Sequence, residues 1–273
     1  MPDPPASRPI WWRALTEGVH DLSRLVLPVE CPGCGEWDVP VCDACRAVLD
    51  GPPVRCEEDV PRLDRMDGLA PLPVWALASY AGPARGLVLG WKDRGRVDLT
   101  GLMVEAVHRV GAEVAPSLVG AVLGPGGGRL LVVPVPTTAA ARRRRGADLV
   151  RRLAVGLVDG LCQGGLDAGL APVLARRRAR DQVGLGARAR ARNSAGSVRV
   201  RAPGNGPGRR LLPAVTGASC LLVDDVVTTG STLAVCEDAL RRQGALVLGA
   251  IVIAATPAPS RAEGRVSSGA AGD

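Results

Sequence analysis

Short apolar runs alternate with longer segments of helical periodicity along most of the chain. The runs at 74–80, 130–136, 220–223 and 246–254 have the length and composition of buried strands. Helical spacing predicts a helix over 100–116, a second carrying Leu149, Leu153 and Leu157, and a third over Thr232–Gln243 that ends at Gly244. The last strand–helix–strand unit predicts a right-handed parallel crossover, and thus an α/β fold with a parallel sheet.

The same pattern divides the chain into four parts. Residues 1–10 are rich in proline and are predicted to be disordered. Residues 11–72 hold an amphipathic helix over 11–27, a group of cysteine-bearing turns, and a linker rich in proline and aspartate from about residue 50. Residues 73–256 form the α/β domain, and residues 257–273 are predicted to be a disordered tail.

Charge is unevenly distributed along the 273 residues, whose formal net charge is +7. Residues 142–210 carry 17 Arg against 4 Asp, whereas residues 1–75 carry 7 Arg against 13 acidic residues. A basic segment of this kind suggests an anionic partner, although a solvated arginine-rich surface explains it equally well. Lys92 is the only lysine, so arginine abundance by itself says little about a phosphate site.

The location expected from the sequence is the cytoplasm. No apolar run approaches the roughly 20 residues that a membrane-spanning helix needs. The first residues, MPDPPASRPIWWRAL, lack the basic start and apolar core of a secretory signal. Cysteines should then be reduced, and closely spaced cysteine pairs favour a metal over a disulfide.

Four cysteines stand in two C-x2-C pairs separated by seven residues: Cys31, Cys34, Cys42 and Cys45. Two such turns supply four thiolates at tetrahedral positions, the preferred ligands of structural Zn²⁺, and they leave no open position for metal catalysis. Gly33 and Gly35 relieve crowding in the first turn. A set of buried reduced cysteines and a [2Fe–2S] site are the alternatives.

The stretch CLLVDDVVTTGSTL, residues 220–233, ends an apolar strand in two carboxylates. The loop that follows offers hydroxyl groups, a flexible Gly230 and the positive end of a helix dipole, which together suit a phosphate. Asp224 and Asp225 would repel that phosphate unless they face hydroxyl groups or a divalent cation. A sugar phosphate with Mg²⁺ meets both conditions. A strand capped by a polar turn is the alternative, and a P-loop ATPase is excluded because no GK[ST] motif is present.

LLVDDVVTTGST resembles the phosphoribosyl-pyrophosphate (PRPP) signature of type I phosphoribosyltransferases at each key position. With the cysteine quartet, the whole chain resembles the ComF/GntX-like family over about residues 22–255. Further matches are Tyr80 followed by GWKDRG, LVVPVPTT, ARRRRGAD, and RRRARDQVGLGARARARN with Gln182, Leu185 and Asn193. The chain departs from the family at Asp148 and Leu149, where an asparagine and a glutamine are usual.

The resemblance implies a type I phosphoribosyltransferase-like sheet flanked by helices, with a small N-terminal zinc-binding module. It implies that the 5′-phosphate and ribose of Mg²⁺-bound PRPP contact Asp224, Asp225, Val226, Val227, Thr228, Thr229, Gly230, Ser231 and Thr232. Val135, Pro136 and Thr137 would form the pyrophosphate loop. Lys92, Arg145, Arg178 and Arg188 would neutralise the leaving group, with Lys92 and the two aspartates in catalytic roles. The segment 176–193 would close over the ligand.

Two functions follow from these observations. The first is transfer of the phosphoribosyl group of PRPP to an acceptor that the sequence does not identify. The second is a competence-associated role in DNA uptake, with single-stranded DNA or a competence helicase as partner and PRPP as regulator. The scarcity of aromatic residues, none of them in the basic segment, weighs against base stacking. The sequence does not indicate an oligomeric state.

Overall fold

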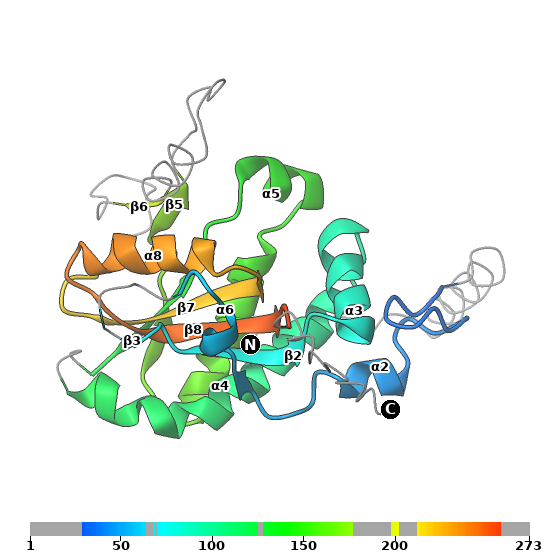
Figure 1. The fold of residues 1–273 in the computed structure, drawn as a ribbon, viewed down its shortest axis with the longest axis horizontal. Coiled ribbons are helices and arrows are strands. Elements are labelled where there is room, and N and C mark those ends of the chain that lie inside the picture. The colour runs from blue at the N-terminus through cyan, green and yellow to red at the C-terminus, as the bar shows by residue number, and fades with distance from the viewer. Residues whose placement is uncertain are drawn as a thin grey trace, which may run out of the picture.

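The computed structural model describes residues 29–63, 68, 70–124, 128–176, 198–201 and 212–257. The helix expected over 11–27 and the segments 1–10 and 258–273 lie outside these ranges. Within them the chain forms a mixed α/β fold built on one mostly parallel sheet (Figure 1). None of the described helices is long and apolar enough to cross a membrane.

Six strands make up the main sheet, in the order β1-β2-β8-β7-β3-β4. They are β1 (Val54–Arg55), β2 (Val74–Ser79), β8 (Leu246–Ala255), β7 (Ser219–Val227), β3 (Leu130–Pro134) and β4 (Ala168–Leu170). Only β1 runs antiparallel to its neighbour. The parallel strands are mostly apolar because both faces are covered, with Asp224 and Asp225 of β7 among the exceptions, and their carboxyl ends meet at one edge of the sheet.

Helices cover the sheet on both faces (Figure 1). One face packs against α3 (Gly82–Asp93), α4 (Leu99–Leu123) and α6 (Leu149–Gln163), and the other packs against α8 (Ser231–Arg241). Two short helices, α2 (Asp43–Ala47) and α5 (Ala139–Arg145), and the 3-10 turn η1 (Glu57–Asp59) lie outside these layers. Apolar clusters on both faces of the sheet hold β7 in place. The acidic pair lies near the carboxyl end of this strand.

The structure extends several of the expected elements. β7 continues through Val227, so both aspartates lie within the strand, and α4 extends the helix expected over 100–116 to Leu123 with Pro116 inside it. The helix α3 was not expected. Its glycines at 86 and 90 and its proline at 83 lower the helical signal of the sequence, and the helix forms because its buried residues, among them Leu87 and Trp91, pack into the core.

Residues 50–63, whose composition predicts a linker, pack onto the sheet. They supply β1, which pairs with β2, and two fully buried side chains, Val60 and Leu63. A second, two-stranded sheet joins β5 (Leu174–Arg176) to β6 (Val198–Val200) in antiparallel register. The residues between these two strands lie outside the described ranges.

Candidate functional site

The two aspartates of β7 point to opposite faces of the sheet, because successive residues of a strand alternate. Asp224 lines a small pocket with the loop that opens α8. The Asp225 side chain faces α3 and is only 7% exposed. The sequence places both carboxylates at one site, and the fold divides them between two environments.

Asp225 forms an ion pair with Lys92, the only lysine of the chain. The Lys92 ammonium lies 2.8 Å from Oδ1 and 2.7 Å from Oδ2 of this carboxylate. Lys92 occupies the last turn of α3, 133 residues before its partner. The backbone N–H of Val226 also donates to Oδ1 of Asp225. Together these contacts hold the buried side chain of Asp225 in one orientation.

Asp224 lacks a comparable partner in the described part of the chain. Removal from water, followed by the negative charge of Asp225, raises its pKa from 3.8 to about 7. A hydrogen bond from the Asp225 backbone N–H and the charges of Lys92 and Arg176 act in the opposite direction. A cation or hydroxyl groups bound in the pocket would stabilise the ionised form of this carboxyl group, whose pKa is raised.

The loop from Thr228 to Thr232 connects β7 to the N-terminus of α8. Gly230 is the N-cap of the helix, with φ +78°, and has no side chain to cap it; the first N–H group, that of Ser231, makes a long 3.5 Å hydrogen bond to the Thr229 hydroxyl. Within the loop the Thr229 and Ser231 hydroxyl groups lie 2.8 Å apart. The pocket that Asp224 and residues 226–233 line has a volume of about 40 Å³. It fits a single anionic group rather than a nucleoside, because pockets for whole small molecules measure about 300–1,000 Å³.

The segment after η1 supports this loop from outside. Arg62 donates its backbone N–H to the Thr229 carbonyl at 3.1 Å. Val60 and Leu63 pack so closely on Gly230 that a Cβ there would lie 2.5 Å from Cγ1 of Val60. Only glycine fits this position, because a side chain would meet both the positive φ and the packed segment.

Two further candidate regions lie beside the acidic pair. Val135–Thr137 follows β3, the neighbour of β7, and Val135 donates its N–H to the Val223 carbonyl at 2.9 Å. Arg145, at the end of α5, has an 11% exposed side chain that lies 3.6 Å from Asp93, the residue after Lys92. Its Nε is buried with no hydrogen-bond partner. Arg178 and Arg188 lie outside the described residues.

Arg176 is a site residue that the sequence reasoning missed. Its Nε donates to the Pro136 carbonyl at 3.0 Å, and its charge lowers the pKa of Asp224. Arg176 therefore lies between the loop after β3 and the acidic pair. In the sequence, Arg176 stands out only as the first residue of the segment 176–193. The many arginines that follow it give no reason to single it out as a site residue.

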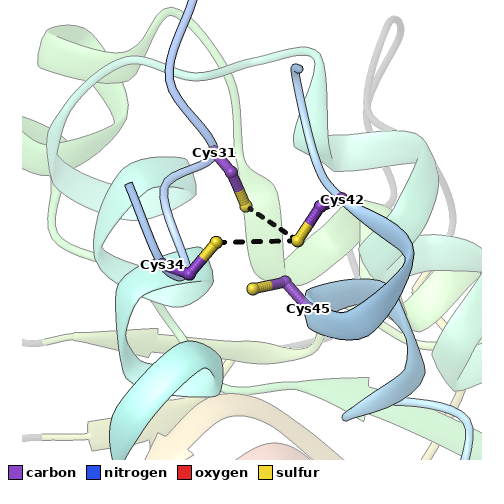
Figure 2. Close-up of side chains that lie close together, drawn as sticks. All are labelled: Cys31, Cys34, Cys42 and Cys45. Atoms are coloured by element: carbon purple, nitrogen blue, oxygen red, sulfur yellow. Dashed lines mark hydrogen bonds between the residues drawn. The ribbon is translucent and has the colours of Figure 1, made fainter. Parts of the chain in front are cut away.

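The four cysteines come together at the other side of α3 (Figure 2). All four Sγ atoms lie within 4.8 Å of one another. The Sγ of Cys42 is 3.8 Å from that of Cys31 and 3.6 Å from that of Cys34. A tetrahedral zinc with Zn–S bonds of about 2.3 Å requires sulfur–sulfur distances of about 3.8 Å. The donor set and its spacing fit such an ion.

The electrostatics of the cluster also fit thiolate ligands. Burial opposes ionisation of Cys31, but hydrogen bonds from the backbone at Cys42, Cys34 and Gly33 lower the pKa of its thiol to about 6. Burial and the neighbouring sulfurs raise the pKa of Cys45. Four sulfurs that share so small a volume are stabilised together when a cation neutralises them.

Comparison with known families identifies the domain that contains β7 and α8. Residues 126–266 match the model of the phosphoribosyl transferase domain. The chain belongs to this family. The matched part contains the acidic pair, the loop of α8, Arg145 and Arg176. It contains neither the cysteine cluster nor α3 with Lys92. No curated protein matched the sequence.

Solved phosphoribosyltransferases are among the structures similar to this chain. The hypoxanthine phosphoribosyltransferase of Trypanosoma cruzi is 16% identical, with a TM-score of 0.36, and the match covers 56% of this chain and 67% of that one. The enzyme of the same name from Staphylococcus aureus is 12% identical, with a TM-score of 0.32, over 57% of this chain and 64% of its own. This chain thus matches about two thirds of each.

A larger pocket adjoins the phosphoribosyltransferase loop. It has a volume of about 530 Å³ and is lined by Gly51, Pro52, residues 54–56, Asp59, residues 76–79 and residues 255–257. Thr256, which lines this pocket, donates its backbone N–H at 2.9 Å to the carbonyl of Val227, which lines the smaller one. The volume of the larger pocket falls within the range of small-molecule sites. Most of its lining residues precede the part of the chain that matches the family.

Proposed function

We propose that the protein binds PRPP with Mg²⁺ and transfers the phosphoribosyl group to an acceptor. The pocket that Asp224 and the loop of α8 line is the observation that supports this proposal. Its helix N-terminus, with glycine at the N-cap, and its hydroxyl groups suit the 5′-phosphate, and the adjacent Asp224 suits ribose hydroxyl groups and the cation. The phosphoribosyl transferase domain family supplies the class of chemistry.

The roles that we propose differ between the two aspartates. Asp224 contacts the ribose hydroxyl groups and Mg²⁺, and binding of the cation stabilises its ionised form. Asp225 holds the ammonium of Lys92, which keeps a positive charge beside the reacting centre. Lys92, Arg145 and Arg176, with the backbone N–H of Thr137, neutralise the departing pyrophosphate, together with Arg178 and Arg188 from the segment that we propose closes over it.

The proposed reaction breaks the bond between ribose C1 and the pyrophosphate oxygen and forms a bond from C1 to the acceptor. Positive charge develops on the ribose, and negative charge leaves with the pyrophosphate. The larger pocket at Thr256 is the space in which we place the acceptor. Its mostly apolar lining, with Arg55, Asp59, Ser79 and Thr256 as polar residues, suits a planar heterocycle.

We further propose that the protein is a ComF-type phosphoribosyltransferase of the cytoplasm, with structural zinc on Cys31, Cys34, Cys42 and Cys45. The free cysteines of the described residues and the charged substrate both favour that compartment. A competence role through single-stranded DNA stays an alternative, in which PRPP binding is regulatory. Its support is the arginine-rich segment, most of which lies outside the described residues.

The deciding experiment is calorimetric titration of the purified protein with PRPP in the presence of Mg²⁺. We expect binding that requires Mg²⁺ and that is lost in the double variant Asp224→Asn/Asp225→Asn. Asp159→Asn, which changes an exposed aspartate of α6, is the matched control and should bind as the wild type does. Absence of binding in the wild type would contradict the proposal.

The same purified protein can be used to distinguish the DNA-binding alternative from phosphoribosyl transfer. Binding of single-stranded DNA that weakens steeply with salt and persists in the double aspartate variant would assign the DNA site to other residues. Production of pyrophosphate with a heterocyclic acceptor would instead establish transfer.

A further inference from the structure

The helix α3 lies between the two candidate sites of the molecule. Gly86 and Gly90 are one helical turn apart and face the first cysteine turn, whereas Lys92 lies about 200° around the axis from Gly90 and contacts Asp225. The cysteine cluster and the acidic pair thus act on opposite faces of the same helix. Neither the cluster nor α3 is part of the matched phosphoribosyltransferase region.

The contact on the cysteine side permits little movement. A Cβ on Gly90 would lie 2.9 Å from Cβ of Pro32, and one on Gly86 would lie 2.9 Å from Cα of Gly33. Pro32 and Gly33 are the two residues between Cys31 and Cys34. The turn that carries the first two thiols therefore fits directly against the backbone of α3.

Arg96, just after α3, fastens both cysteine turns to the helix. Its guanidinium donates to the carbonyl of Glu30 at 3.0 Å and to the carbonyl of Pro40 at 2.8 Å. These residues lie immediately before Cys31 and two residues before Cys42. A bidentate pair with Asp98 fixes the guanidinium in place. Buried Cys31, Cys45 and Leu49 share one apolar cluster with Leu87 and Trp91 of α3.

We propose that the four-cysteine centre, when it holds its metal, positions α3 so that Lys92 pairs with Asp225. The metal thereby controls the charge arrangement of the phosphoribosyltransferase site. Without a metal the four thiols lose their common fixed point, so the turn at Pro32 and Gly33 loosens. The module is then a positioning device for Lys92.

The single lysine makes this proposal directly measurable. An amine-reactive acylating reagent can modify only Lys92 and the α-amino group, and mass spectrometry distinguishes the two products. In zinc-loaded protein the pairing with Asp225 should make acylation of Lys92 slow. After removal of zinc by a chelator, below the unfolding temperature, the rate should rise by about fivefold or more, the lower end of typical coupling between sites. The α-amino group reports reagent activity.

A pair of glycine variants tests the same link without removing the metal. Gly90→Ala introduces the contact with Pro32, whereas Gly101→Ala in α4 adds a methyl group with no atom within 4 Å. In zinc-loaded protein we expect faster acylation of Lys92 in Gly90→Ala and a wild-type rate in Gly101→Ala. Circular dichroism verifies that each sample is folded. Equal rates in loaded and stripped folded protein, or in the two variants, would overturn the proposal.

A further experiment, which rests on the proposed function, measures PRPP binding and tests whether the effect of zinc passes through Lys92. Zinc removal should weaken PRPP binding in the wild type but should add little in Lys92→Met, because the path through Lys92 is already lost. Full additivity of the two changes would overturn the route through Lys92. If the intact protein binds no PRPP, the proposed function fails, and the acylation rates still decide the coupling.

Discussion

At the scale of single residues, adjacent aspartates have separate chemical settings. Asp225 has a cationic partner and a backbone donor, which fix its orientation. Asp224 faces the small pocket with its pKa raised to about 7. The unliganded protein therefore carries an electrostatic cost at Asp224, which binding of a cation would relieve.

This cost predicts a pH effect on the stability of the unliganded protein. The folded state keeps a proton on Asp224 up to about pH 7, whereas the unfolded chain loses it near pH 3.8. Raising the pH through this window therefore lowers the free energy of unfolding. Asp224→Asn cannot titrate, so it should be more stable than the wild type at pH 8 by about 1–3 kcal/mol and nearly equal at pH 4.

Chemical denaturation at both pH values measures this difference. Asp159→Asn should show no pH-dependent difference from the wild type, since Asp159 is exposed on α6. A stability gap for Asp224→Asn that is the same at pH 4 and pH 8 would contradict the assignment.

The Lys92–Asp225 pair carries a second prediction at this scale. Lys92→Met leaves a buried carboxylate without its cation, so we expect a loss of about 1–3 kcal/mol in the free energy of unfolding, at the lower end for buried pairs because Lys92 is partly exposed. Lys92→Met/Asp225→Asn should recover much of that loss. Thermal or urea unfolding of the two variants measures it, and an equally large loss in the double variant would exclude pairing as the cause.

At the scale of elements, the loop that opens α8 depends on a segment far away in the chain. Val60 and Leu63 close one side of Gly230, and Arg62 bonds to the carbonyl of Thr229. The loop shape is thus set jointly by the positive φ of Gly230 and by residues 60–63, which lie between β1 and β2. Substrate affinity should respond to changes in either partner.

Gly230→Ala tests this dependence. Alanine would adopt φ +78° at a cost of about 1–2 kcal/mol, and its Cβ would meet Val60. We expect lower stability and at least tenfold weaker PRPP binding by calorimetry, the latter corresponding to about 1.4 kcal/mol. Gly101→Ala, which has open space, should raise the stability by about 0.5–1 kcal/mol and leave binding unchanged. Unchanged binding in Gly230→Ala would show that the loop does not contact the ligand.

At the scale of the whole molecule, the cysteine module is part of the core. Cys31 and Cys45 belong to the same apolar cluster as α3, α4 and α6. Arg109 of α4 binds the carbonyl groups of Leu49 and Gly51 at 2.6 and 2.9 Å. Metal binding at the module is therefore expected to stabilise the whole fold.

Removal of zinc should lower the melting temperature of the complete protein in a single cooperative step. Differential scanning calorimetry of loaded and chelator-treated protein measures this shift. Cys34→Ser should reproduce it, whereas Cys162→Ser, at an exposed position away from the cluster, should leave both zinc content and melting temperature unchanged. Equal zinc content in Cys34→Ser and wild type would exclude Cys34 as a ligand.

The sequence was most informative where chemistry is local. The parallel βαβ unit and the α/β class could be predicted because the apolar periods of 246–254 and 232–243 are strong. The cysteine quartet could be predicted because its spacing is short. By contrast, α3 was missed because Gly86 and Gly90 weaken its helical signal. A larger side chain at either position would clash with Pro32.

The sequence by itself determined which groups are available: two adjacent carboxylates, a hydroxyl-rich loop, four thiols and one lysine. Only the tertiary structure decided how they are combined. It turned Asp224 toward the loop and Asp225 toward Lys92, it brought Arg176 to the loop after β3, and it set α3 between the cysteines and the sheet. The physical reason is that the alternation of side chains along β7 and the apolar packing of α3 determine which charged groups meet. They bring Lys92 to Asp225, although the two residues are 133 positions apart in the sequence.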